Sequence, residues 1–291
     1  MTISRCTRLA CLSAVLALAL AALTACVNTL QAGGASPSSS GNGSTKSARP
    51  FSSSSSDDIV TASDESDVRK RARIRLELAT AYFSQGQLTT ALDELKYVLA
   101  IDDKMSDAHE LRGLIYSAME EPALAEESFK RSIQLNERNG SAMHNYAWWL
   151  CNKQRYPEAD ALFERATNLG QTVVVSKTLM ARGVCQSRAG LLPEAEKSLA
   201  RSYELDVGNP ATAYNLAEVL YRRGDYERAR FYIRRVNNIP EQITPESIWL
   251  GIRIENRLAN ADGRDELAVT LRSRFPSSRE ASALELGRFN E

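Results

Sequence analysis

The sequence has few of the residues from which metal centres and active sites are built. It contains only two histidines and five cysteines. Neither His109 nor His144 lies in a His-Glu-x-x-His motif, and no paired Cys-x-x-Cys is present, so we interpret both histidines as ordinary helix residues. Gly-x-Gly-x-x-Gly loops, phosphate loops and Gly-x-Ser-x-Gly elbows are also missing. These absences argue against an enzyme and predict no metal and no cofactor.

The chain also lacks an excess of charge of either sign. Its 36 basic side chains balance its 36 acidic ones, and no long block of one sign occurs. A neutral chain of this kind has no electrostatic footprint for nucleic acid and no polybasic patch for anionic lipid. Acidic pairs such as Glu126-Glu127 are interpreted as solvated helix faces. The composition therefore favours protein partners over nucleic acid.

The single apolar run lies at the start of the chain. Arg5 and Arg8 precede the Ala-rich segment 9–25, which is shorter than the ~20 residues that a membrane-spanning helix needs. Small residues follow, and the run closes on Leu23-Thr24-Ala25-Cys26, as in a secretory signal. This ending resembles the bacterial lipoprotein signal, which implies that residues 1–25 are removed and that Cys26 carries lipid, including palmitate. An uncleaved membrane helix, or an ordinary signal with a chance cysteine, is the alternative.

The residue after Cys26 bears on the location. Val27 is not the aspartate that commonly retains lipoproteins at the inner membrane. The resemblance therefore implies a lipid anchor in the outer membrane, on its periplasmic face. Several acyl chains would hold the protein there permanently, since each buried methylene contributes ~0.8 kcal/mol.

Two cysteines remain for the folded part once Cys6, Cys11 and Cys26 are assigned to the signal and the anchor. Cys151 and Cys185 are too few for a disulfide framework. The predicted compartment permits a bond between them, but two small buried thiols are the simpler interpretation. The sequence leaves this choice open.

Residues 26–64 predict a flexible linker. Ser- and Gly-rich stretches such as 36–44 and 52–56 offer almost no apolar side chains to offset chain entropy. About 38 flexible residues span typically about 35 Å. The linker would let the folded part, predicted over 65–291, work away from the membrane surface.

An internal period of about 34 residues occupies this folded part. The repeated positions are a small residue on a first helix, a turn, and an alanine on a second helix, as in Ala79, Gly86 and Ala91. Small residues let two helices approach closely, and glycine supplies the positive φ of the turn. Pro122, Pro157 and Pro193 fall where second helices begin.

The pattern resembles the tetratricopeptide repeat. The resemblance implies an all-α fold, a right-handed superhelix of about six helix pairs. The units are predicted near 72–105, 106–139, 140–173, 176–209, 210–243 and 244–276, followed by a C-terminal tail, 277–291.

In peptide-binding relatives the first helices line a groove, and the resemblance assigns particular repeat positions to it. Read onto this chain, these positions are Phe83, Leu114, His144, Asn145, Trp148, Cys151, Met180, Val184, Tyr214, Asn215, Glu218, Tyr221, Arg222, Ile248 and Ile252. Such a lining is apolar and aromatic, and suits an amphipathic helix or an extended apolar segment. Lys177, Arg188 and Arg222 look scattered rather than clustered. Because Trp148 and Trp149 cannot face the same way, one of them is interpreted as packing, and the asparagines have the alternative role of tying neighbouring helices together.

Several sequence segments point to a particular group of tetratricopeptide repeat proteins. Asp107-Ala108-His109-Glu110, Ala123-Leu124-Ala125-Glu126-Glu127, Asn145-Tyr146-Ala147, Ile248-Trp249-Leu250-Gly251-Ile252-Arg253 and Arg274-Phe275-Pro276 resemble the type IV pilus lipoproteins of the PilW or PilF family. The resemblance implies a pilotin, which binds the secretin subunit and promotes its localisation and multimerisation in the outer membrane. The alternatives are a periplasmic scaffold that recruits peptidoglycan hydrolases or other envelope-assembly proteins, and a component of outer-membrane protein insertion.

Overall fold

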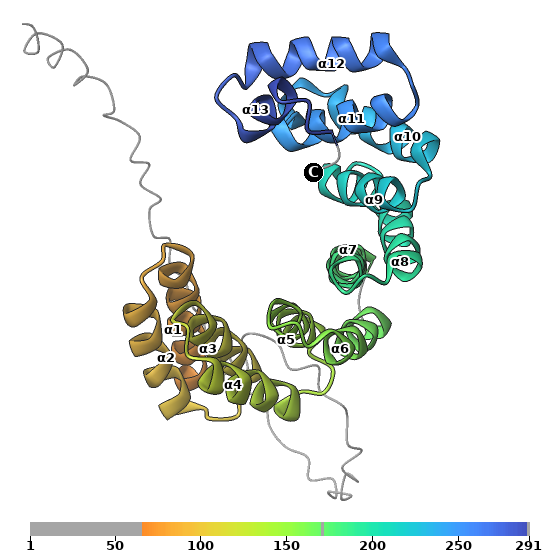
Figure 1. The fold of residues 1–291 in the computed structure, drawn as a ribbon. Helices are drawn as coiled ribbons and strands as arrows, with labels where there is room; N and C mark the ends of the chain where they lie inside the picture. Colours follow the sequence, from red (N-terminus) through yellow and green to blue (C-terminus); the bar gives the residue numbers. More distant parts are fainter. Residues whose placement is uncertain (1–65, 170–171, 290–291) are drawn as a thin grey trace, which may run out of the picture. The chain divides into compact units, whose positions relative to one another are not determined.

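The computed structural model describes residues 66–169 and 172–289, and every regular element in these ranges is helical. The predicted signal segment, Cys26 and the linker lie outside the described residues. Six pairs of antiparallel helices follow one another along the chain (Figure 1), which confirms the predicted all-α repeat fold. The pairs are α1 (Asp67–Ser84) with α2 (Leu88–Ile101), α3 (Ser106–Ala118) with α4 (Pro122–Leu135), α5 (Gly140–Asn152) with α6 (Tyr156–Leu169), α7 (Thr172–Arg188) with α8 (Leu192–Leu205), α9 (Pro210–Arg222) with α10 (Tyr226–Asn237), and α11 (Pro245–Arg257) with α12 (Ala261–Arg274). A 3₁₀ turn, η1 (Pro240–Gln242), precedes α11, and a seventh-pair remnant, α13 (Arg279–Glu285), follows α12.

Small residues set the distance between the two helices of a pair. A Cβ added at Gly113 would lie 2.7 Å from the ring of Phe129, and one added at Gly183 would lie 2.5 Å from Leu199 Cγ. Such distances are shorter than carbon atoms tolerate, so α3 and α7 can approach their partners only with glycine at these positions. The large fully buried side chains Phe129, Phe163 and Leu199 then fill the space opposite the small residue.

The tight turn inside each pair requires a left-handed backbone. Three turns use glycine: Gly86, Gly190 and Gly224 have φ of 74°, 81° and 82°. The corresponding turns of the other pairs place Glu120, Gln154 and Ala259 at φ of 60°, 61° and 55°. An L-residue in this region costs about 1 kcal/mol or more, so three of the six turns carry a local strain that glycine would remove. In the last pair Ala259 holds this position, whereas a step of 34 residues from Gly224 falls on Leu258.

The apolar core runs through the stack as four consecutive clusters of buried side chains. The first joins α1, α2 and α3, the second α4 to α7, the third α8 to α11, and the fourth joins α11, α12 and α13. Each cluster crosses from one pair to the next, so a pair completes its core only by packing on its neighbour. Helix starts are fixed locally, for example by Pro122 in the first turn of α4 and by a capping box between Thr244 and Ser247 at α11.

The helix bounds differ from the predicted units at three places. Helix α1 begins at Asp67, ahead of residue 72, and α7 begins at Thr172, ahead of residue 176. Residues 172–175, which precede the predicted fourth unit, thus lengthen its first helix at the N-terminal end. The predicted tail contains α13, whose start is capped by Ser278. Within the described ranges, no helix combines the length and hydropathy that crossing a bilayer would require.

Candidate protein-binding site

The first helices of neighbouring pairs contact one another, so α1, α3, α5, α7, α9 and α11 form one continuous surface, the first-helix face. Predicted binding residues Phe83, Leu114, Trp148, Met180 and Tyr214 all lie on it, half-buried and packed on the core clusters beneath. Val184 and Glu218 are half-buried on the same helices. The face therefore offers apolar and aromatic side chains that keep part of their surface in solvent.

The two adjacent tryptophans of α5 separate as expected. Trp149 is 7% exposed and packs in the core with Phe129 and Tyr146. Trp148 is half-buried on the first-helix face, and the guanidinium of Arg188 lies 4.9 Å from its ring centre. Trp148 is thus the tryptophan that a partner can reach.

The two asparagines of the predicted site form internal hydrogen bonds. Asn145 donates to Glu110 at 2.6 Å, and Asn215 donates to the Ala211 carbonyl at 2.7 Å. Glu110 also accepts from Ser141 at 2.6 Å and from Asn139 at 3.3 Å. Burial raises the pKa of the Glu110 carboxyl despite these donors. Asn145 therefore ties α5 to α3, the alternative role foreseen for it, and its prediction as a partner contact stays a prediction.

His144 is a second inter-repeat tie. Its Nδ1 is 3.0 Å from the Thr178 hydroxyl of α7, and its ring meets Phe163 edge-on. Burial, with a smaller contribution from Lys177, lowers the pKa of His144 to about 4. The imidazole is consequently neutral at physiological pH and presents no charge to a partner.

The C-terminal end of the first-helix face differs from the prediction. Ile248 and Ile252 are 1% and 0% exposed, because they pack with Leu271 of α12 and with Ala281 and Leu284 of α13. The prediction that Ile248 and Ile252 line a binding groove is therefore wrong. A helix from the predicted tail covers the positions that are open in earlier repeats.

Side chains one position further along α11 contact the C-terminal segment. Trp249 stacks on Phe289 at 5.8 Å between ring centres, and Arg253 Nε donates to the Phe289 carbonyl at 3.3 Å. The Arg253 guanidinium also lies 4.6 Å from the ring centre of Tyr221, which is only 8% exposed. Tyr221, predicted to contact the partner, is thus mostly covered, whereas Arg222 beside it is exposed.

A cavity of about 390 Å³ opens between α9, α11 and α13. Tyr214 and Glu218 form one wall, and the others carry Glu246, Trp249 and Arg253. Burial and the nearby Glu218 raise the pKa of Tyr214 to about 12, so its hydroxyl stays protonated. Mixed charges beside aromatic rings suit the binding of a polypeptide better than proton transfer.

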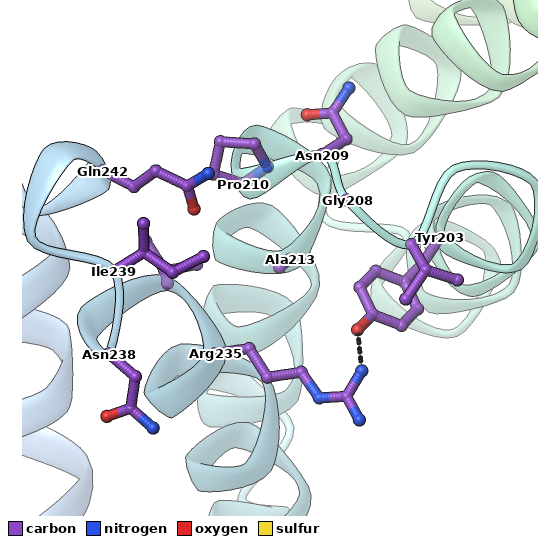
Figure 2. Close-up of a pocket in the computed structure, with 11 residues that line it drawn as sticks. Tyr203, Gly208, Asn209, Pro210, Ala213, Arg235, Asn238, Ile239 and Gln242 are labelled. Carbon is purple, nitrogen blue, oxygen red and sulfur yellow. Dashed lines mark hydrogen bonds between the residues drawn. The ribbon is translucent and has the colours of Figure 1, made fainter.

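A second cavity, of about 330 Å³, lies beside the N-terminal end of α9 (Figure 2). It opens between the end of α10 and the segment before α9, beside Pro210 and Ile239. The two titratable side chains of its lining are already joined, since Arg235 donates to the Tyr203 hydroxyl at 2.5 Å. The cavity thus offers an apolar hollow with no unpaired titratable group, and we assign it no function.

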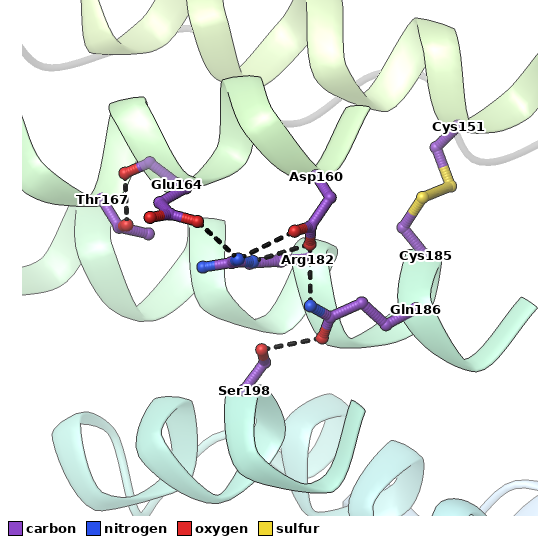
Figure 3. A network of polar contacts seen from close by, with 8 residues as sticks. All are labelled: Cys151, Asp160, Glu164, Thr167, Arg182, Cys185, Gln186 and Ser198. Atoms are coloured by element: carbon purple, nitrogen blue, oxygen red, sulfur yellow. Dashed lines mark hydrogen bonds and ion pairs between the residues drawn. A yellow bond between two sulfur atoms is a disulfide. The ribbon is translucent and has the colours of Figure 1, made fainter. Parts of the chain in front are cut away.

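The third and fourth pairs are joined more firmly than the sequence suggested (Figure 3). Cys151 of α5 and Cys185 of α7 form a disulfide with their Cα atoms 5.8 Å apart. The simpler interpretation of two free thiols is therefore wrong: neighbouring first helices approach closely enough to bond, a distance that sequence spacing does not reveal. Cys151 is buried and is not available to a partner.

Polar contacts reinforce the same joint. Arg182 of α7 makes two hydrogen bonds to Asp160 of α6, at 2.8 and 2.9 Å, and a third to Glu164 at 3.0 Å (Figure 3). Gln186 links Asp160 to Ser198 of α8. The Arg182 guanidinium lowers the pKa of Asp160, so this carboxylate stays ionised. The region around Trp148 thus rests on a rigid base.

Sequence reasoning named Arg188 without grouping it with Arg222, and it missed Trp249 and Arg253. Arg188 and Arg222 are one repeat apart and occupy the same last-turn position of their helices, a signal that was present in the spacing. Trp249 and Arg253 could not be found this way, because their place beside the cavity depends on how α13 packs on α11. Across residues 66–169 and 172–289, no three His, Cys, Asp or Glu side chains are placed to hold a metal ion.

Comparison with known proteins defines the class. Family models of the tetratricopeptide repeat match residues 106–139 and 140–175. With the six helix pairs, these matches show that the chain is a tetratricopeptide repeat protein.

Relatives of known name narrow this further. The type IV pilus assembly protein PilF of Pseudomonas aeruginosa is 25% identical over 208 residues, which cover 70% of this chain and 81% of PilF. A solved structure of Pseudomonas aeruginosa PilF superposes with a TM-score of 0.65 at 24% identity, covering 75% of this chain and 99% of PilF. The crystal structure of PilW, a type IV pilus biogenesis factor, gives a TM-score of 0.67 at 24% identity, covering 74% and 98%. The chain is a PilF/PilW-like tetratricopeptide repeat protein.

Proposed function

We propose that this protein acts in type IV pilus biogenesis as a pilotin. It binds a segment of the secretin subunit on the first-helix face and, through lipid on Cys26, brings that subunit to the outer membrane, where it multimerises. The similarity to PilF and PilW supports the pathway. The observation that carries the mechanism is that Trp148 and Tyr214 remain in contact with solvent on this face.

The contacts of these two aromatic residues suit a binding role. Each is half-buried, so its ring is held in place by the core while one side stays open. Tyr214 also borders the cavity between α9, α11 and α13. Fixed aromatic side chains lose little entropy on binding and supply much of the affinity of protein interfaces.

Deletion of the gene tests the role in the cell. The amount of secretin multimers should fall sharply, and twitching motility should be lost. Unchanged multimers would contradict the proposal. Altered septation with normal pili would instead favour a scaffold for peptidoglycan hydrolases.

The binding surface is tested by exchanging Trp148 and Tyr214 for alanine together. Affinity of the purified protein for the secretin subunit should fall at least ~30-fold, since such anchors contribute about 2 kcal/mol or more. Tyr97→Ala with Phe231→Ala is the matched control, because both side chains are exposed aromatics on second helices. Equal loss in both variants, or a lowered melting temperature in the first, would remove the assignment.

The anchor is tested by Cys26→Ser. The wild-type protein should incorporate a palmitate analogue and sediment with outer membranes, whereas the variant should do neither. Incorporation that persists in Cys26→Ser would show that the lipid is attached elsewhere.

A further inference from the structure

Arg188 and Arg222 hold equivalent positions in the last turns of α7 and α9. Arg188 Nη1 donates to Asn152 Oδ1 at 2.9 Å, while its guanidinium lies over Trp148. Arg222 Nη1 donates to the carbonyl and the hydroxyl of Ser187, at 3.1 and 2.7 Å. Arg222 of α9 thus reaches back to α7, the helix that carries Arg188, just as Arg188 reaches back to α5.

The hydrogen-bond partners of these two arginines are neutral, whereas those of three other arginines of the stack are carboxylates. Arg155 bonds to Glu126 and Glu158, Arg182 to Asp160 and Glu164, and Arg228 to Glu196 and Asp225. In residues 66–169 and 172–289, no carboxylate oxygen lies within ion-pair distance of Arg188 or Arg222; Glu218, one turn before Arg222, is the acid closest to it in its own helix. Both side chains are exposed, so this face keeps two positive charges that the fold does not neutralise.

The hydrogen bonds also leave two nitrogen atoms of each guanidinium, Nε and Nη2, able to bind a partner. The hydrogen bonds of Arg188 and Arg222 named above all start from Nη1, so Nε and Nη2 can donate two parallel hydrogen bonds to one carboxylate. Because Asn152 and Ser187 already fix the side chains, a carboxylate that arrives does not have to order them. Trp148 beside Arg188 supplies an apolar surface next to the charge.

We propose that Arg188 and Arg222, together with Trp148, form a subsite of the first-helix face that binds acidic side chains. The occupant is a protein segment that places aspartate or glutamate next to an apolar residue. This inference rests on the proposed function in that the same face binds the partner, and it specifies the partner's chemistry. Charge complementarity selects this occupant, since an apolar segment alone would leave both arginines without a counter-charge.

A random peptide library tests the subsite without a known partner. Peptides are selected for binding to the full-length protein in detergent, and those that bind the Trp148→Ala variant less tightly are kept. These peptides should be enriched in aspartate or glutamate beside an apolar residue. Exchange of that acid for its amide should weaken binding about 10- to 100-fold, the usual loss for a hydrogen bond to a charged group. The exchange of the acid for its amide is measured on the unchanged protein, so this comparison stands even if a variant fails to fold.

The protein arm exchanges Arg188 and Arg222 for glutamine. The double variant should bind the acidic peptide about 10- to 100-fold less tightly and should bind the amide peptide almost as well as the wild-type protein does. The effects of the arginine substitutions and of the acid-to-amide exchange should therefore not be additive. Arg188→Lys with Arg222→Lys should fall between, because lysine keeps the charge but not the paired donors. Arg165→Gln with Arg201→Gln, on second helices, removes the same charge elsewhere and should have no effect. No enrichment of acids, or equal affinities in the test and control variants, would overturn the proposal.

Failure of the subsite and failure of the proposed function give different results. If the secretin subunit binds and the double glutamine variant binds it equally, the subsite is wrong and the pilotin role stands. If acidic peptides bind through Arg188 and Arg222 but the secretin subunit does not, the subsite stands and the partner is another protein. Dimers in analytical ultracentrifugation that Arg188→Gln with Arg222→Gln abolishes would make a second copy of the chain the occupant, and would overturn the proposal as stated.

Discussion

The fourth and the sixth helix pairs place the same repeat positions in opposite environments. Val184 of α7 is half-buried on the first-helix face, whereas Ile252, at the same position of α11, is completely buried. The helices themselves are alike, and the difference comes from α13, which packs on α11 at the end of the stack. A repeat position therefore defines a binding residue only where no other element covers it.

The largest effect on stability should come from a substitution at the position that α13 covers. Ile252→Ala should destabilise the sixth pair by about 2–5 kcal/mol, because it leaves a cavity among α11, α12 and α13. Val184→Ala at the same repeat position should cost less than about 1 kcal/mol. Hydrogen exchange should show the loss confined to residues 245–289, since pairs at the end of a stack open locally. Equal costs would mean that α13 does not cover α11 in solution.

The disulfide is a second difference between the two regions, because it links the third and fourth pairs and the sixth pair contains no such bond. Replacing Cys151 and Cys185 by alanine should lower the free energy of unfolding by about 2–4 kcal/mol, the usual contribution of a bond that closes a loop of this size. Denaturant titration measures the change, and reductant added to the wild-type protein should reproduce it. A reductant effect that persists in the double alanine variant would contradict this origin.

A smaller effect concerns pH and distinguishes His144 from Ile248, its counterpart in the sixth pair. The pKa of His144 is about 4 in the fold and about 6.5 in an unfolded chain. Between these values the unfolded state binds the additional proton, so stability falls as the pH falls from 6.5 towards 4. Between pH 7.5 and 5 the loss from this group should be about 1–2 kcal/mol. His144→Gln should show a shallower pH dependence in denaturant titrations, with Glu110 and His109 common to both proteins; equal slopes would exclude His144 as the cause.

The smallest predicted effect lies in the turns. Gln154→Gly in the third pair and Ala259→Gly in the sixth should each stabilise the protein by about 0.5–1 kcal/mol, because glycine removes the cost of a positive φ. Gly190→Ala at the same turn of the fourth pair is the reverse experiment and should destabilise by a similar amount. Thermal unfolding compares the three, and a lowered melting temperature for Gln154→Gly would show that its side chain has another role.

The fold was predictable because its signals are local and repeated. Small residues such as Gly113 and Gly183, turn residues such as Gly224, and helix-starting prolines recur at the period of the repeat. An incorrect alignment of one repeat on the others then shows itself, because its residues depart from the common pattern. One helix pair predicts the next.

The candidate site was less predictable because its residues depend on contacts between pairs. The burial of Ile248 and Ile252 requires knowledge that α13 packs back on α11, and nothing in their own helix encodes it. The disulfide depends on an approach of two helices that spacing alone does not give. Arg188 and Arg222, by contrast, could have been grouped from the sequence, since one period separates them; treating them as scattered overlooked the rule that had identified the fold.

The Cys151–Cys185 bond has a mechanical consequence. A load applied between the two ends of the described stack would normally separate whichever neighbouring helix pairs hold each other least. Because the bond connects α5 directly to α7, the segment between them, including α6, cannot lengthen until a covalent link is cut. Extension must therefore begin at another interface, and Trp148 and Arg188, which flank the bond on α5 and α7, keep their spacing while the rest of the stack yields.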